Sequence, residues 1–290
     1  MSHASYIRDH SQLLEPIPTG LEPRLFAIPE LRGVIFDIYG TLIISAAGDI
    51  SLAGADDRDE AMRRAVVDGT GIPVPETVTH LTEAYRTLIG EAQDRRRAEG
   101  IEFPEVEIRE IWRDLLTKWH HPGASDTDAC ERIAVAYEVA VNPVWPMPGL
   151  AETLASLKAG ESFLGIISNA QFYTPHLFPA FLGDRDLAAL GFDDWLQVYS
   201  YQQREGKPSR RLYEVLAERL NERDLTPGEF LYVGNDRRND IWPAQAVGFR
   251  TALFAGDRRS LRLREEDHRV TDVTADLVVT DLRQLLEVVP

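Results

Sequence analysis

VIFDIYGT, residues 34–41, is an apolar run that ends in a carboxylate and a turn. The three apolar residues before Asp37 predict a buried strand, and Gly40 with Thr41 predicts a turn directly after it. A strand that ends in this way delivers a carboxylate to the mouth of a sheet, a position that suits a nucleophile. A second acid two residues later would be the natural proton donor to a leaving group, but that position holds Tyr39.

Beyond residues 148–149 the chain alternates between short β-rich runs and amphipathic helices. Together with the run at 33–38, the predicted strands are 163–168, 196–201, 229–235, 250–255 and 275–280, and the predicted helices are 149–159, 209–222, 239–247 and 281–288. Strands separated by helices form a parallel sheet with helices on both faces. We therefore expect an α/β fold with a doubly wound parallel sheet that binds its ligand at the carboxyl ends of the strands.

The segment that follows the first strand is predicted to be a helical insert. Apolar residues recur at spacings of three and four in residues 59–71, 76–100, 105–119 and 127–141, and nothing from about 45 to 145 is convincing as a strand. Residues 1–30 are polar and interrupted by prolines, so we expect an extension that drapes over the body or is partly disordered. The predicted domains are thus an N-terminal extension (1–30), an α/β core (31–44 and 146–290) and an all-helical domain (45–145).

Composition limits the partners of this chain. Its 31 Lys and Arg against 47 Asp and Glu give a net charge of −16, which disfavours nucleic acid and anionic membranes. Neither a signal-peptide pattern nor an apolar run of about 18 residues is visible. The single cysteine, Cys130, excludes an internal disulfide and a Cys-rich zinc site. We expect a cytoplasmic protein that acts on a small anionic substrate, with its oligomeric state open.

Polar side chains follow the predicted strands and would converge at one edge of the sheet. Asp37 is a candidate nucleophile, although it could instead cap the turn that follows it. Ser168 and Asn169 offer a hydroxyl and an amide that can hold the oxygens or the leaving atom of a substrate. Lys207, which alone would be an ordinary surface lysine, could neutralise developing charge and keep the nucleophile ionised. These residue types together are typical of a hydrolase.

The last polar cluster offers oxygen ligands for a metal ion. Asp240, with either Asn235 or Asp236, supplies the carboxylate and amide oxygens that suit Mg²⁺, although Asp240 could also only cap the helix that follows. The helical insert contributes several arginines, among them Arg86, that could hold an anionic part of a substrate. The sequence singles out none of them.

Four motifs in this order resemble the haloacid dehalogenase (HAD) superfamily of hydrolases. The family pattern of Asp-x-Asp-Gly-Thr, Ser/Thr, Lys and Gly-Asp-x-x-x-x-Asp is similar to 37–41, Ser168, Lys207 and 234–240 here. The resemblance runs from about 33 to 288, and the helical insert is similar to the C1 cap of the family. It implies a HAD-like Rossmannoid core, an aspartyl-ester intermediate on Asp37, and a cap that closes over the core to exclude water and select the substrate.

The resemblance also implies a metal site and makes Tyr39 a departure. In metal-dependent members the ion lies between the nucleophile, a main-chain carbonyl two residues later and acids of the final motif, here Asp37, Tyr39 and Asp240. Tyr39 replaces the acid that protonates the leaving group of phosphatase substrates, a role worth about 10²- to 10⁴-fold in rate. The family's 2-haloacid dehalogenases carry Asp-x-Tyr-Gly-Thr, because halide leaves without a proton. Tyr39, Thr41 and Asn169 are the candidates for substrate binding.

Three functions follow from these motifs. The favoured one is Mg²⁺-dependent hydrolysis of a small phosphorylated metabolite whose leaving group needs little protonation, such as an acyl phosphate or a phosphonate. The second is metal-independent hydrolysis of a carbon–halogen bond in a 2-haloacid, which the neutral Asn235 also favours. The third is a degenerate, non-catalytic binding protein.

Overall fold

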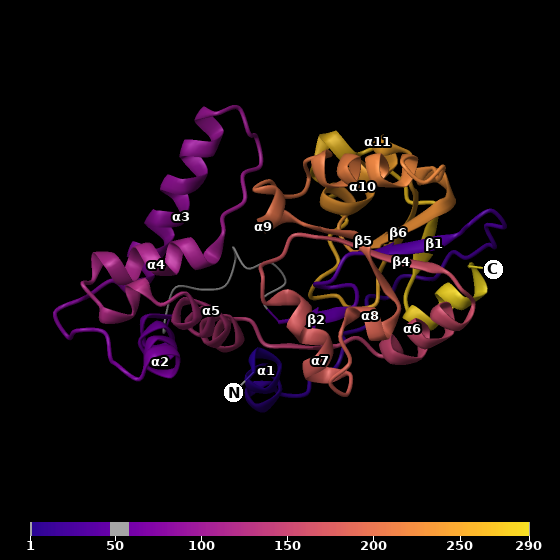
Figure 1. Cartoon of the computed structure of the whole chain (residues 1–290). Coiled ribbons are helices and arrows are strands. Elements are labelled where there is room, and N and C mark those ends of the chain that lie inside the picture. The colour runs from indigo at the N-terminus through magenta and orange to yellow at the C-terminus, as the bar shows by residue number, and fades with distance from the viewer. Residues whose placement is uncertain (1, 47–57, 290) are drawn as a thin grey trace.

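Six parallel strands form the central sheet of the protein, and a computed structural model describes residues 2–46 and 58–289. The strand order is β5-β4-β1-β6-β7-β8, and each neighbouring pair is parallel (Figure 1). The bounds are β1 Gly33–Phe36, β4 Phe163–Ser168, β5 Phe192–Tyr199, β6 Phe230–Gly234, β7 Arg250–Phe254 and β8 Leu277–Val279. This arrangement confirms the predicted doubly wound parallel sheet.

Successive residues of the central strand serve two separate cores, as the alternation of side chains along a strand requires. In β1, Ile35 packs with α10 and α11, whereas Val34 and Phe36 belong to the larger core on the opposite face. Figure 1 shows α10 and α11 above the sheet and α6, α7 and α8 below it. The bounds of these helices are α6 Leu150–Ala159, α7 Leu177–Phe181, α8 Leu187–Leu190, α10 Arg211–Asn221 and α11 Trp242–Val247.

Some predicted elements differ in extent or type. Strand β5 starts at Phe192 rather than at 196. The predicted helix at 239–247 is a π-helical turn, Arg237–Ile241, that continues into α11. The predicted helix at 281–288 is a 3₁₀ helix, Leu282–Glu287. Further short helices are Pro122–Ser125, Thr174–His176, α9 Ser200–Gln203, Pro227–Glu229 and His268–Val270.

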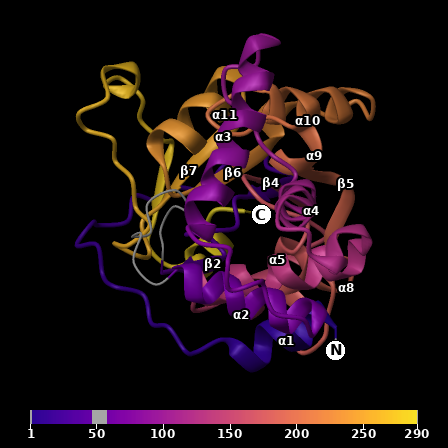
Figure 2. The same cartoon turned by 90° about the vertical axis from the view of Figure 1, so that its left-hand side faces the viewer.

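Four α-helices occupy the described part of the insert, and Figures 1 and 2 show them to one side of the sheet. They are α2 Arg58–Thr70, α3 Leu81–Ala98, α4 Ile108–Lys118 and α5 Thr127–Val141. Helix α5 begins where it does because the Asp126 side chain accepts a hydrogen bond from the Ala129 amide. Residues 47–57, which the sequence assigns to the start of the insert, lie outside the described residues. The domain bounds stay a prediction.

A small antiparallel pair joins the two ends of the insert. Strands β2 Ile43–Ser45 and β3 Val144–Pro146 lie where the chain leaves and re-enters the core. The expectation of no strand between 45 and 145 was therefore wrong for β3. Three residues are too few to show the alternation by which a strand is recognised in a sequence.

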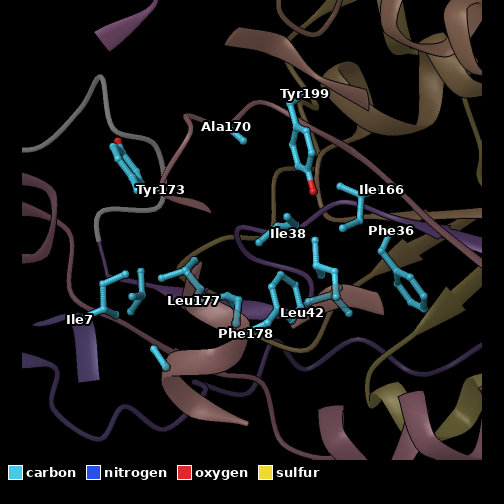
Figure 3. Close-up of a cluster of buried hydrophobic side chains, with 14 of the residues drawn as sticks. Ile7, Phe36, Ile38, Leu42, Ile166, Ala170, Tyr173, Leu177, Phe178 and Tyr199 are labelled. Atoms are coloured by element: carbon cyan, nitrogen blue, oxygen red, sulfur yellow. The ribbon is translucent and has the colours of Figure 1, made fainter. Parts of the chain in front are cut away.

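The N-terminal segment forms a helix that the sequence did not predict, α1 His3–His10. It packs against α5 of the insert and α7 of the core. Ile7 is only 1% exposed and lies beside Leu177 and Phe178 in the apolar cluster of Figure 3. Only Ala4 and Ile7 of this helix are buried, and two residues give no periodic signal. Farther along the extension, Arg24 forms an antiparallel bridge with Val278.

Candidate active site

The carboxyl ends of three adjacent strands bring the predicted site residues together. Asp37 directly follows β1, Ser168 ends β4, and Asn235 directly follows β6. Strand β1 pairs with β4 on one side and β6 on the other, so these three ends lie side by side. The crevice outside the carboxyl ends of such strands is where open α/β sheets bind ligands.

Asp37 uses one of its two oxygens to hold its neighbours. Its Oδ1 accepts a hydrogen bond from Ser168 Oγ at 2.9 Å and from Lys207 Nζ at 2.6 Å. Among residues 2–46 and 58–289, no hydrogen-bond donor contacts Oδ2. The carboxylate is therefore oriented through one oxygen while the other is free to attack a substrate.

Lys207 lies between two buried carboxylates. Its Nζ donates to Asp37 Oδ1 and to Asp240 Oδ1, each at 2.6 Å, and the side chains of Lys207, Asp37 and Asp240 are 3%, 8% and 3% exposed. Burial alone lowers the pKa of Lys207, but the charges of Asp240 and Asp37 outweigh burial and raise it. Burial and the charge of Asp37 raise the pKa of Asp240, against the effect of Lys207. One ammonium thus serves two carboxylates.

Tyr232 completes this cluster and was missed by sequence analysis. Its hydroxyl accepts a hydrogen bond from Lys207 Nζ at 2.9 Å and donates to Asp240 Oδ1 at 3.0 Å. The residue lies inside the apolar run of β6, where a tyrosine is indistinguishable from an ordinary core residue. No sequence signal marks it.

Tyr39 contacts the crevice wall rather than the nucleophile. Its hydroxyl shares a hydrogen bond of 3.1 Å with Thr174 Oγ1. Burial, followed by the nearby charge of Glu138, raises the pKa of Tyr39 well above its ordinary value. Glu138, from α5, accepts a hydrogen bond from the Tyr173 hydroxyl at 2.9 Å, and burial raises its pKa too. The phenol of Tyr39 is therefore a worse acid than an unperturbed tyrosine.

Asn169 and Thr41, both predicted to bind substrate, make hydrogen bonds within the protein. Asn169 Oδ1 accepts from the backbone amide of Lys207 at 2.7 Å, which fixes the loop that carries the lysine. Thr41 is fully buried, and its Oγ1 donates to Asn235 Oδ1 at 3.2 Å. Asn169 lines the cavity described below and remains able to meet a substrate, whereas Thr41 is absent from the lining.

Two glycines allow the loops of the site to approach one another. Gly40 has a φ of +85°, and a Cβ on it would lie 2.6 Å from the Cβ of Ser260. A Cβ on Gly234 would lie 2.5 Å from the Cβ of Asp240. Any larger residue at either position would displace the loops that hold the carboxylates.

The candidate metal ligands divide into two groups. Asp37 and Asp240 converge on Lys207, as described above. Asn235 donates through Nδ2 to the carbonyl of Ser260 at 2.6 Å, and Asp236 forms an ion pair with Arg264 at 2.5 Å. Asp236 also accepts from the Arg238 and Asn239 amides, so it caps the turn that carries Asp240.

The donor set fits Mg²⁺ better than a metal held by protein side chains alone. Within the described ranges, no three His, Cys, Asp or Glu side chains form a group that could hold a metal ion. Mg²⁺ usually takes only one or two carboxylates and completes its shell with water and phosphate oxygens. Asp37 and Asp240, which share the Lys207 ammonium, match that number of carboxylates.

A cavity of about 690 Å³ opens over these residues. Its lining includes Asp37, Lys207 and Asp240 from the core. Its other walls include Tyr85, Arg86 and Tyr137 from the helical insert. The helical insert therefore lines the same cavity as the candidate site residues of the core. None of the described helices is both long enough and apolar enough to cross a membrane.

Known proteins resemble this chain in sequence and fold. A family model described as haloacid dehalogenase-like hydrolase matches residues 31–248. A phosphoglycolate phosphatase of Salmonella paratyphi A is 30% identical over 234 residues, which cover 76% of this chain and 80% of that protein. The phosphoglycolate phosphatase of Escherichia coli K12 is 29% identical over 229 residues, covering 76% and 79%.

One solved structure supports the fold in particular. The 2-haloacid dehalogenase of Pseudomonas syringae pv. tomato DC3000 superposes with a TM-score of 0.50 at 21% identity, covering 89% of this chain and 97% of that one. At this identity the likeness concerns the fold alone.

Proposed function

The chain belongs to the haloacid dehalogenase-like hydrolase family, and we propose that it hydrolyses a small phosphorylated metabolite with the help of Mg²⁺. One observation carries the proposal: the carboxylates of Asp37 and Asp240 share the Lys207 ammonium at 2.6 Å each. The similarity to phosphoglycolate phosphatases supports phosphate over halide as the group removed.

In the proposed reaction, the free oxygen of Asp37 attacks phosphorus, and the bond from phosphorus to the leaving oxygen breaks. Water then cleaves the resulting aspartyl phosphate, which releases phosphate and restores the carboxylate. Ser168 orients the nucleophile, and Lys207 keeps it ionised and stabilises negative charge as it develops. The helical insert, acting as a cap, would shield the crevice from bulk solvent during the first step.

Asp37, the main-chain carbonyl of Tyr39 and Asp240 would hold Mg²⁺, which would neutralise the charge of the phosphate. We prefer Asp240 to Asp236 as the ligand, because Asp240 shares the Lys207 ammonium with Asp37, whereas Asp236 pairs with Arg264 instead. Asn235 is bonded to Ser260 and Thr41 and is the weakest candidate.

Tyr39 limits which leaving groups are tolerated. Its hydroxyl is bonded to Thr174 and its pKa is raised by burial, so it is a poor proton donor. We propose that the leaving group needs little protonation, as in an acyl phosphate. The same feature favours a second candidate function, metal-independent hydrolysis of a 2-haloacid, in which halide leaves without a proton.

A substrate screen with and without Mg²⁺ separates the two candidates. Acyl phosphates, phosphate esters, phosphonates and 2-haloacids would be tested on chelator-treated protein. Phosphate release that a chelator abolishes and Mg²⁺ restores is the expected result. Halide release that proceeds without metal would overturn the proposal and establish the second candidate.

A further inference from the structure

Residues 103–108 of the insert, which join α3 to α4, run along two loops of the core, and we call them the docking segment. Figure 1 shows this stretch passing beside α9. One of the two core loops, 169–171, directly follows Ser168 at the end of β4. The other, 204–207, follows α9 and carries Lys207. The docking segment therefore contacts the parts of the chain that present both hydrogen-bond donors to Asp37.

Main-chain hydrogen bonds join the docking segment to the loop of Lys207. The amide of Gly206 donates to the carbonyl of Phe103 at 2.8 Å, and the amide of Glu105 donates to the carbonyl of Arg204 at 3.1 Å. The next amide, that of Lys207, is held by the core, as described above. Two successive amides of this loop are thus fixed by different partners, the first by the insert and the second by the core.

Gln171 fastens the docking segment to the other core loop. Its Nε2 donates to the carbonyl of Val106 at 2.9 Å, and its Oε1 accepts from the amide of Ile108 at 3.1 Å. One side-chain amide thus pairs with two main-chain groups of the insert. All three residues are less than a tenth exposed, so the loss of this side chain would leave buried polar groups without partners.

Ser200, the first residue of α9, connects the docking segment to the same loop by a second route. Its Oγ donates to Glu105 Oε2 at 3.1 Å and accepts from the amide of Ala170 at 3.0 Å. The serine is fully buried. A single hydroxyl therefore links the insert to the loop that follows Ser168.

The backbone of Arg204 indicates that the lysine loop is held in place by its surroundings. Its φ of +56° lies in the left-handed region, which disfavours a residue with a Cβ, and such a conformation persists only where contacts enforce it. The insert supplies these contacts: Glu105 holds the Arg204 carbonyl, and Glu110 of α4 accepts two hydrogen bonds from its guanidinium group, at 2.7 and 2.9 Å. We expect the loop to relax when the docking segment leaves it.

We infer that the docking segment positions Lys207, and that Gln171 and Ser200 are the positioning residues through which the insert does so. The insert then contributes to the chemical step by a route that needs no contact with the substrate: it fixes the loop whose ammonium Asp37 and Asp240 share. The kinetic consequence of the inference rests on the proposed phosphatase function. The placement of Lys207 does not.

NMR of lysine labelled with ¹³C at Cε measures that placement directly. The chain has only three lysines, Lys118, Lys158 and Lys207, so each signal can be assigned by Lys118→Arg and Lys158→Arg. In both Gln171→Leu and Ser200→Ala we expect the Lys207 signal to shift or to split into more than one state. The other two signals should stay unchanged, since Lys118 is exposed and Lys158 donates to the carbonyl of Ala189.

Kinetics separates positioning from binding. Gln171→Leu and Ser200→Ala should lower kcat for phosphate release about tenfold and change KM less than about threefold, because a misplaced lysine weakens the transition state more than the bound substrate. Ser200 does not line the cavity, so its effect cannot come from a lost substrate contact. Gln93→Leu is the matched control: Gln93 lines the same cavity, but its hydrogen bond is to Arg97 within α3. It should leave the Lys207 signal unchanged and kcat within about twofold of wild type.

Thermal unfolding would verify that each variant is folded, and Ser200→Ala alone decides if Gln171→Leu is not. A Lys207 signal that is unchanged in the folded variants would overturn the inference, whatever their activity. A rise in KM at constant kcat would also overturn it, because it would indicate a role in substrate binding. If no phosphorylated substrate is hydrolysed, the proposed function fails, and the NMR measurement still decides the placement of Lys207.

Discussion

Replacing Lys207 with methionine should destabilise the protein in a manner that depends on pH. Lys207 is the ammonium shared by the buried carboxylates of Asp37 and Asp240, and all three side chains are less than a tenth exposed. Removing one partner of a buried ion pair leaves an uncompensated charge and typically costs about 3–5 kcal/mol. In the Lys207→Met variant the two remaining carboxylates also repel each other. We therefore expect the loss in free energy of unfolding to lie in the upper part of that range at about pH 7.5.

Acidification should reduce this loss. The pKa of Asp240 is raised in the folded protein by burial and by Asp37, so the folded state binds a proton more tightly than the unfolded chain. Above the pKa of Asp240 in the folded protein, its ionised carboxylate therefore lowers the free energy of unfolding. This loss decreases as the pH falls from that pKa toward the lower pKa of the unfolded chain. Without Lys207 the pKa of Asp240 rises further, and the difference between wild type and variant should shrink at about pH 5.

Urea unfolding with linear extrapolation at the two pH values measures the effect. Lys118→Met is the control, since Lys118 is exposed on α4. This variant should change the free energy of unfolding by less than about 0.5 kcal/mol at both pH values. A loss below about 1 kcal/mol for Lys207→Met, or one that is equal at the two pH values, would refute the shared-ammonium argument.

Four further substitutions probe the proposed chemistry. Asp37→Asn should lower phosphate release by more than about 10³-fold with unchanged circular dichroism, and activity within about tenfold of wild type would exclude Asp37 as nucleophile. Tyr39→Asp should raise turnover of alkyl phosphates by about 10²-fold or more and leave acyl phosphates nearly unchanged; an equal gain on both would contradict a missing proton donor. Asp240→Asn should cost about 10²-fold in activity and Asp236→Asn less than about tenfold, and the reverse order would make Asp236 the metal ligand.

The sheet and the ends of its strands were predictable because they are local patterns. The run before Asp37 and the run before Ser168 both show uninterrupted apolar residues followed by a polar one. Parallel pairing then brings such ends together without any further information. Lys207 and Asp240 were predicted as polar residues beyond the ends of predicted strands, and they also fit the family motifs. Their convergence on Asp37 follows from the same topology.

What the sequence could not reveal are the contacts that decide between neighbouring polar residues. Asn235 and Asp236 look equivalent in the sequence, yet the first is bonded to Ser260 and the second to Arg264, both from a loop that follows β7. Tyr232 is hidden in an apolar run for the same reason: its role depends on Lys207, which lies far away in the sequence. A sequence pattern shows which polar side chains are present but not which residues they contact in the fold.

The substitution of Tyr39 for an acid links the reaction to the choice of substrate. The Tyr39 hydroxyl bonds to Thr174 in the core, and the neighbouring Tyr173 hydroxyl bonds to Glu138 on α5 of the insert. The position two residues after Asp37 is thus part of the wall between core and insert, and burial makes the Tyr39 hydroxyl there a weaker proton donor than an ordinary tyrosine. Because such a site gives the leaving group little help from an acid, it favours substrates whose leaving group departs without a proton.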